Sequence, residues 1–294
     1  MITCSEDGSV RLWDLESGAQ IGEDWRDGAN ESGVFAISLS PNGKIVASGS
    51  SDGTVRLWDV ERPKVIAKWA GHIQGVKSLC WHADGNCLLS ASYDGTAIVW
   101  NVAETRMGEI VLGPIETGHD IVYEAKYSPD TTKIATCGRN ENGVKIWDAN
   151  TGELLSTLKH NDWVYSLAWT LDHKKLISAS FVGSIRIYDT ATWKEIAILN
   201  GHEVRPIRLS VNNQLLASTS WDNTARLWNL DIGVPVGQPL RHEARVNGAA
   251  FSADGTLLVT SCDDTNAYVW DIHTILKDPG LEDILSIPDV GHIS

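Results

Sequence analysis

The sequence is poor in basic residues and has no long hydrophobic run. It contains 24 Lys and Arg against 38 Asp and Glu, a formal net charge of −14 at pH 7. A chain this acidic lacks the broad basic surface with which proteins hold nucleic acid or an anionic membrane. No segment approaches the ~18 consecutive apolar residues of a membrane span, and the first residues do not begin a signal peptide. We therefore expect no nucleic-acid partner and no membrane partner.

Cysteine is scarce, and its pattern indicates neither disulfides nor a zinc site. The five residues are odd in number and share no Cys-x-x-Cys spacing: Cys4, Cys80, Cys87, Cys137 and Cys262. Such a pattern is typical of small apolar strand residues in a reducing compartment. We therefore expect a cytoplasmic protein, with the nucleus as the alternative, and no metal or cofactor.

Tryptophan, in contrast, is abundant and recurs at a regular interval. There are 13 Trp, and seven segments end in an aromatic residue followed by Asp or Asn. Successive segments are 40 to 47 residues apart, close to the repeat length of four-stranded propeller blades. The repeats end at Trp13, Trp58, Trp100, Trp147, Tyr188, Trp228 and Trp270.

A tight turn precedes most of these aromatic residues. In residues 46–58 and 88–100 an apolar strand, an Asp-Gly pair and a second strand follow one another. Asp-Gly between two alternating runs predicts a β-hairpin, because the turn needs a positive φ that glycine adopts freely. Gly-His pairs at 71–72, 118–119 and 201–202 precede a further strand. The sequence thus predicts repeated strands and no helix.

The pattern of Gly-His, Ser-x-Asp-Gly and Trp-Asp resembles the WD40 repeats of the β-transducin family. The resemblance covers residues 1–271. It implies an all-β, seven-bladed WD40 β-propeller, with a C-terminal tail over 272–294.

The resemblance also implies a hydrogen-bond network inside a blade. The Asp of the turn, a His, a strand hydroxyl and the Trp indole satisfy one another, so that a polar cluster can be half-buried. The hydroxyl would come from Ser90 or Ser92 in blade three, Ser218 or Ser220 in blade six, and Thr260 or Ser261 in blade seven. The other members would be His72, Asp94 and Trp100; His202, Asp222 and Trp228; and His242, Asp264 and Trp270.

Three blades depart from this pattern. Blade two has Asn30 in place of the His, and blade four has a longer turn over 139–143 without the Asp. Blade five has Phe181 ahead of a Val-Gly turn, and Tyr188 in place of Trp. We expect core packing alone to hold these blades.

The two ends of the sequence predict an incomplete first blade. Residues 1–8 match the second strand of a blade and its turn, so blade one would lack its innermost strand. Residues 284–287 match the outer strand of blade seven, and Gly291-His292 follows. This predicts 27 strands instead of 28, and we interpret the chain as a fragment of a longer protein or as one that starts at an internal Met. The alternative is a native protein whose tail fills the gap in another way.

Ser, His and Asp recur together, yet the pattern does not predict an enzyme. A catalytic triad is needed only once, whereas this trio recurs in several blades. The sequence contains no Gly-x-Ser-x-Gly elbow, phosphate-binding loop or His-Glu-x-x-His motif. We therefore expect no catalysis, and a propeller enzyme stays a remote alternative.

The resemblance further implies a binding surface on the top face, where innermost strands begin and the turns between second and third strands lie. The side chains at these positions, called the rim residues below, are Phe35, Lys77, Tyr93, Tyr123, Trp163, Tyr165, Phe181, Arg205, Trp221 and Arg245. Aromatic residues and Arg are enriched at interaction hot spots. We therefore predict a scaffold or adaptor that binds proteins or peptides as a subunit of a multiprotein complex. The alternative is a reader of phosphorylated or otherwise modified residues that uses Arg205 and Arg245.

Overall fold

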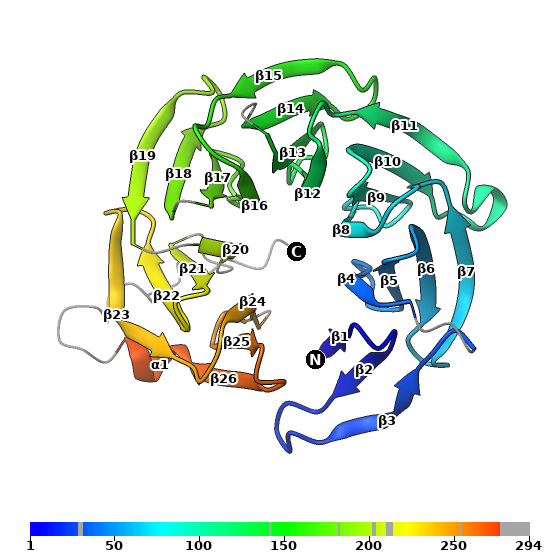
Figure 1. The fold of residues 1–294 in the computed structure, drawn as a ribbon, viewed down its shortest axis with the longest axis horizontal. Coiled ribbons are helices and arrows are strands. Elements are labelled where there is room, and N and C mark those ends of the chain that lie inside the picture. The colour runs from blue at the N-terminus through cyan, green and yellow to red at the C-terminus, as the bar shows by residue number, and fades with distance from the viewer. Residues whose placement is uncertain are drawn as a thin grey trace, which may run out of the picture. The chain divides into compact units, whose positions relative to one another are not determined.

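The computed structural model describes residues 1–28, 32–140, 143–181, 183–201, 214–252 and 254–276, and the backbone of 204–209. These residues form 26 strands in seven antiparallel sheets (Figure 1). The prediction of an all-β fold with seven blades is confirmed. The chain divides into two compact units, the N-terminal unit Met1–Trp163 and the C-terminal unit Val164–Ser294.

The N-terminal unit contains blades one to four. Blade one has three strands, and the others have four, paired in chain order. The strands are β1 (Ile2–Cys4), β2 (Val10–Trp13) and β3 (Gln20–Trp25); β4 (Val34–Leu39), β5 (Ile45–Ser50), β6 (Thr54–Asp59) and β7 (Lys64–Ala70); β8 (Val76–Trp81), β9 (Cys87–Ser92), β10 (Thr96–Asn101) and β11 (Ile110–Glu116); and β12 (Ile121–Tyr127), β13 (Lys133–Arg139), β14 (Val144–Asp148) and β15 (Leu154–Leu158).

The C-terminal unit contains blades five to seven. Blades five and six have four strands, and the described part of blade seven has three. The strands are β16 (Val164–Trp169), β17 (Lys175–Ser180), β18 (Ser184–Asp189) and β19 (Glu195–Asn200); β20 (Val204–Leu209), β21 (Leu215–Ser220), β22 (Thr224–Asn229) and β23 (Val234–Arg241); and β24 (Val246–Phe251), β25 (Leu257–Cys262) and β26 (Ala267–Asp271).

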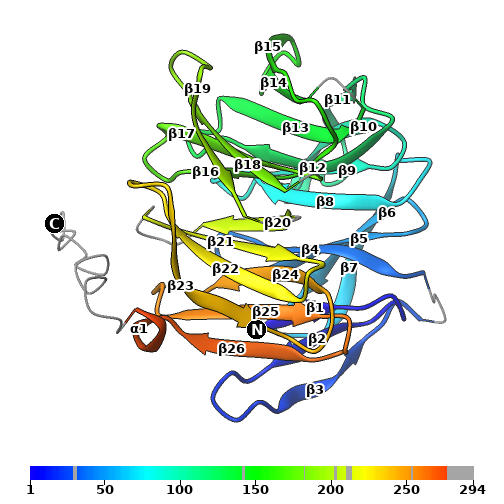
Figure 2. The same cartoon turned by 60° about the vertical axis from the view of Figure 1, so that its left-hand side comes forward.

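Two short helices interrupt this pattern, so the prediction of no helix is wrong. A 3-10 helix spans Glu104–Arg106, and α1 spans Ile272–Ile275. Asp271 caps α1 by accepting a hydrogen bond from the Thr274 N–H, an interaction that stabilises a helix start. Figure 2 shows α1 directly after β26. In the part of the chain described, no helix is both long and apolar enough to cross a membrane.

The Asp-Gly turns form the tight hairpins that the sequence predicts. Gly95 lies between β9 and β10 with φ of 84°. A Cβ atom at this position would lie 2.6 Å from the His119 carbonyl oxygen. Only glycine therefore combines this backbone conformation with so close an approach of the next segment.

The core of each unit lies between adjacent sheets. The first strands of neighbouring blades contact each other, β4 with β8 and β8 with β12 in the N-terminal unit, and β16 with β20 and β20 with β24 in the C-terminal unit. Trp81 is buried in this layer, and its indole N–H donates to the Ser38 carbonyl of β4 at 3.0 Å. Polar and apolar groups of Trp81 thus both join blade two to blade three.

The ends of the chain are described only in part. The N-terminal amine donates to the Trp13 carbonyl at 2.7 Å and so extends the pairing of β1 with β2. Among the described residues blade one consists of β1, β2 and β3, and the prediction that it lacks an innermost strand stays a prediction because 277–294 lie outside them. The predicted outer strand at 284–287 and Gly291-His292 lie outside the described residues.

Candidate functional site

In blade three the structure brings together all the predicted members of the network. The Trp100 indole N–H donates to Ser90 Oγ at 2.8 Å, and Ser90 Oγ lies 2.8 Å from His72 Nε2. His72 Nδ1 lies 3.1 Å from a carboxylate oxygen of Asp94. Burial lowers the pKa of His72 although Asp94 opposes this shift. The two ring nitrogens of His72 thus link the Asp94 carboxylate to the Ser90 hydroxyl.

In blade six the network is described in part. The Trp228 indole N–H donates to Ser218 Oγ at 2.7 Å. Asp222 accepts from the backbone N–H and the hydroxyl of Thr224 at 3.0 and 2.6 Å. His202 lies outside the described residues.

In blade seven one predicted contact is wrong. Thr260 Oγ1 accepts from the Trp270 indole at 2.9 Å and lies 2.7 Å from His242 Nε2. Asp264, however, accepts from the Tyr268 hydroxyl at 2.5 Å, whereas His242 Nδ1 lies 3.1 Å from the Leu240 carbonyl oxygen. The phenol of Tyr268 reaches the Asp264 carboxylate from the neighbouring strand β26. Its ring packs edge-on against His242, with the two ring centres 4.8 Å apart.

Blade two is not held by core packing alone, contrary to the prediction. Trp58 donates to Ser48 Oγ at 2.8 Å, as in the other blades. The buried guanidinium of Arg56 donates to Ser50 at 2.7 Å, Asp52 at 3.0 Å and Asp27 at 2.8 Å. Arg56 thus contacts the turn Asp and a strand hydroxyl, the two kinds of group that His72 contacts in blade three.

The same prediction is wrong for blade four. His119 lies 3.4 Å from Thr136 Oγ1 and 3.2 Å from Asn140 Oδ1, and Trp147 donates to Thr136 at 2.9 Å. The Asn140 amide therefore replaces the missing carboxylate. Burial lowers the pKa of His119 to about 4. The Gly118-His119 pair was visible in the sequence, but the role of Asn140 was not.

Blade five also contains a polar contact at the equivalent place. The buried Tyr188 shares a side-chain hydrogen bond with Ser178. Burial raises the pKa of the Tyr188 phenol. Packing alone therefore does not hold this blade either.

The rim residues of the N-terminal unit form a row of aromatic rings across three blades. The rings of Phe35 and Tyr93 lie 6.0 Å apart, and those of Tyr93 and Tyr123 lie 6.4 Å apart at right angles. The Lys77 ammonium group lies 5.2 Å from the centre of the Phe35 ring. All four side chains are partly exposed. Mutual contact therefore restricts these rings while leaving part of their surface open.

Two further residues of the N-terminal unit belong to this surface and were missed in the sequence. The Arg139 guanidinium lies 4.9 Å from the centre of the Trp163 ring. Arg139 was missed because the turn that it begins, 139–143, was too irregular to align with the turns of the other blades. Ile73 is 87% exposed, and its N–H donates to Asp94 at 2.9 Å, so the network of blade three anchors its backbone. Its place directly after Gly-His was the signal that could have identified it.

The rim residues of the C-terminal unit form two pairs. Tyr165 and Phe181 are partly exposed, with ring centres 5.8 Å apart. The Arg245 guanidinium lies 4.6 Å from the centre of the partly exposed Trp221 ring. The side chain of Arg205 lies outside the described residues.

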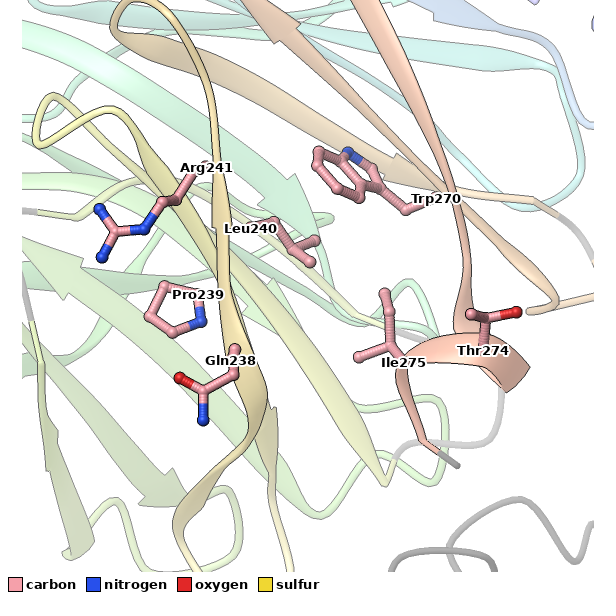
Figure 3. A pocket seen from close by; sticks show the side chains of 7 residues that line it. All are labelled: Gln238, Pro239, Leu240, Arg241, Trp270, Thr274 and Ile275. Carbon is pink, nitrogen blue, oxygen red and sulfur yellow. The ribbon is translucent and has the colours of Figure 1, made fainter. Parts of the chain in front are cut away.

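A groove lies beside blade seven in the C-terminal unit (Figure 3). Its volume is about 590 Å³, and Leu240, Trp270 and Ile275 surround it together with Gln238, Pro239, Arg241 and Thr274. In the described residues β26 has no strand on its outer side. Trp270 is partly exposed here, whereas the equivalent Trp228 is 2% exposed in a core cluster with Leu199 of β19.

The described side chains offer no obvious reactive group. Ser90 Oγ is engaged with both Trp100 and His72. Burial raises the pKa of the Cys4 thiol to about 11, and it also raises that of Cys137, which disfavours the reactive thiolates. No group of three or more His, Cys, Asp or Glu in the described ranges is placed to hold a metal ion. The rim residues are therefore the strongest candidate site.

Comparison with known proteins gives a consistent match. The family described as "WD domain, G-beta repeat" matches residues 1–14, 26–59, 63–101, 112–148, 152–189, 193–229 and 233–271. Periodic tryptophan protein 2 of Arabidopsis thaliana is 29% identical in an alignment that covers 49% of this chain and 21% of that protein. Nuclear distribution protein PAC1 of Arthroderma otae is 31% identical over 54% of this chain and 37% of that protein.

A solved structure has a similar fold. A chain in the structure titled "Crystal Structure of Mitotic Checkpoint Complex" superposes with a TM-score of 0.79, at 23% identity, over 92% of this chain and 86% of that chain. The chain aligns with well under half of the length of the two relatives named above.

Proposed function

The chain belongs to the WD40-repeat family and has its seven-bladed β-propeller fold, and we propose that it is a non-catalytic scaffold or adaptor. It binds partner proteins or peptides through its rim residues, as a subunit of a multiprotein complex.

The observation that carries this proposal is the row of Phe35, Tyr93 and Tyr123. These large rings are fixed by mutual contact while remaining partly exposed. Ring fixation reduces the entropy lost when a partner orders them, and aromatic residues dominate interaction hot spots. The highly exposed Ile73 adds apolar surface on blade three. A surface of this kind suits a protein or peptide better than a small metabolite.

A second function is favoured by one observation. Arg245 stacks on Trp221, which presents a cation on an aromatic platform. This arrangement suits a reader of phosphorylated or otherwise modified residues. All five cysteines are free thiols, which supports a reducing location, and we propose the cytoplasm, with the nucleus as the alternative.

Affinity capture with the whole chain as bait tests the main proposal. The wild-type chain is compared with Tyr93→Ala/Tyr123→Ala, and with Leu154→Ala/Leu155→Ala as the matched control. The control removes two apolar side chains, 50% and 49% exposed, on β15. We expect the tyrosine variant to lose specific partners that the wild type and the control retain, with an unchanged melting temperature. Equal capture by all three chains would contradict the proposal.

A further inference from the structure

We infer that two Arg–Trp pairs, Arg139 with Trp163 and Arg245 with Trp221, are separate anion-binding sites for acidic side chains of a partner peptide. The chemistry that each recognises is a carboxylate or a phosphate monoester. This inference rests on the proposed function, because it specifies the chemistry of the partner.

Each pair holds a guanidinium against an indole ring. The guanidinium carbon lies 4.9 Å from the ring centre in the first pair and 4.6 Å in the second. Both distances are within the ~6 Å range of a cation–π contact. Stacking restricts the guanidinium, while its planar set of N–H donors can still engage an anion through two parallel bonds. Both Arg side chains are exposed, so an anion can reach them.

The charges of Arg139 and Arg245 are not neutralised within the described chain. Other arginines form ion pairs, such as Arg11 with Asp24 at 2.9 Å and Arg186 with Glu195 at 2.8 Å. Among the described side chains no carboxylate lies within 4.0 Å of either Arg139 or Arg245. In a chain with a net charge of −14, unpaired cations at these positions leave room for an external anion.

Two acidic residues beside these pairs, Asp162 and Asp263, have other partners. Asp162, next to Trp163, accepts a hydrogen bond from the Trp163 N–H at 2.7 Å. Asp263, whose N–H donates to the Arg245 carbonyl, accepts from the side-chain amide of Asn247. Neither carboxylate therefore forms an ion pair with the stacked guanidinium.

In the two pairs the Arg and the Trp occupy opposite positions in the blade, so each pair is a separate observation. In the first pair, Arg139 ends a second strand and Trp163 directly precedes an innermost strand. In the second pair, Trp221 directly follows a second strand, and Arg245 directly precedes an innermost strand. The same contact is thus built twice, with the cation supplied from either position. A single chance surface contact does not account for this repetition.

Nuclear magnetic resonance of the side-chain Nε–H groups of the full chain tests the inference. Three Gly-Ser decapeptides serve as probes, with phosphoserine, glutamate or serine at the centre, and inorganic phosphate is a fourth. Arg139→Lys and Arg245→Lys assign the two signals and keep the charge while removing the planar guanidinium. Arg62→Lys is the matched control, because Arg62 is exposed and has no ion pair among the described residues.

We expect the signals of Arg139 and Arg245 to shift with an anionic peptide and not with the serine peptide. Each Lys variant should weaken binding at its own site by about tenfold or more, and Arg62→Lys should not change it. If only the phosphoserine peptide shifts the signals, the sites bind a phosphorylated residue. If the glutamate peptide shifts them equally, the sites bind a carboxylate side chain. Equal shifts with the serine peptide, or wild-type affinity in the Lys variants, would overturn the inference.

The outcome is separable from that of the proposed function. If Tyr93→Ala/Tyr123→Ala loses captured partners while both Lys variants bind anionic peptides as the wild type does, the scaffold proposal stands and the anion sites are refuted. If the tyrosine variant retains all partners but the Lys variants lose peptide binding, the scaffold proposal is refuted and the anion sites stand.

Discussion

Three side chains lie at equivalent positions, four residues after the turn Asp of their blade. They differ in whether they bind the carboxylate of that Asp. Arg56 in blade two forms an ion pair with it, and Tyr268 in blade seven donates a phenol proton to it. Ile98 in blade three can do neither, so Asp94 is left to pair with His72. The contribution of each turn Asp therefore depends on this neighbour.

Asp94 should contribute more to stability than Asp264. We expect Asp94→Ala to lower the free energy of unfolding by about 1–3 kcal/mol, because His72, the Ile73 N–H and the Thr96 N–H lose a shared carboxylate acceptor and only Thr96 Oγ1, at 3.1 Å, remains beside His72 Nδ1. Asp264→Ala should cost less, since His242 already meets the Leu240 carbonyl. Urea denaturation of both variants measures the difference. Equal losses would show that His242 depends on Asp264 after all.

His119 should make stability depend on pH. Its pKa of about 4 in the folded chain lies below the ~6.5 of an unfolded imidazole. Between these values the unfolded chain binds a proton that the folded chain does not, so the free energy of unfolding falls as the pH drops from 6.5 to 4. The loss is on the order of 3 kcal/mol.

Substitution isolates this contribution from those of the carboxylates. His119→Gln should flatten the fall of the unfolding free energy between pH 6.5 and 4. His273→Gln, at an exposed position, is the control and should leave the profile unchanged. A His119→Gln profile parallel to that of the wild type would mean that His119 does not titrate in this range.

At the scale of elements, blade seven differs from the blades beside it in the C-terminal unit. In the described residues, the outer edge of β26 is unpaired, and the groove of Figure 3 lies between β23 and the segment formed by β26 and α1. An open edge of this kind is a template for a further strand. We propose that residues 284–287 provide it.

Truncation after Leu276 tests this proposal. We expect faster amide hydrogen exchange in β26 and a lower melting temperature, because the backbone groups of β26 and the Trp270 ring lose their cover. Exchange in β22, which already pairs on both sides, is the internal control. Identical exchange of β26 with and without residues 277–294 would exclude them as its partner.

At the scale of the whole molecule, the family and its fold do not specify a partner. The rim residues therefore have to select it. The chain has a net charge of −14, yet the rim residues and Arg139 add cations beside aromatic rings. Aromatic area provides affinity, and local charge selects among partners. Affinity and fold stability should therefore respond to different substitutions.

Tyr93 lies at the centre of the aromatic row and should be a binding hot spot. For a partner identified by capture, we expect Tyr93→Ala to weaken binding by about 2 kcal/mol or more. The melting temperature should stay within a degree or two, because the ring is partly exposed. Calorimetric titration and thermal unfolding of the same sample measure both. Unchanged affinity for every captured partner would remove Tyr93 from the site.

The sequence by itself determined the number of blades, the four strands of blades two to six and the hairpin turns. These features follow from patterns within short segments: alternating apolar residues, Asp-Gly pairs such as the one at Gly95, and an aromatic residue at a fixed interval. The rim positions came from the family resemblance, which relates local sequence to a place on a known fold.

Only the tertiary structure decided which groups meet. Arg56 pairs with the turn Asp of blade two, Asn140 stands where other blades have a carboxylate, and Tyr268 rather than His242 donates to Asp264. The stacking of Arg139 on Trp163 was equally hidden, because the two residues are far apart in the chain. Polar contacts depend on distances of a few tenths of an ångström between segments that no local pattern relates.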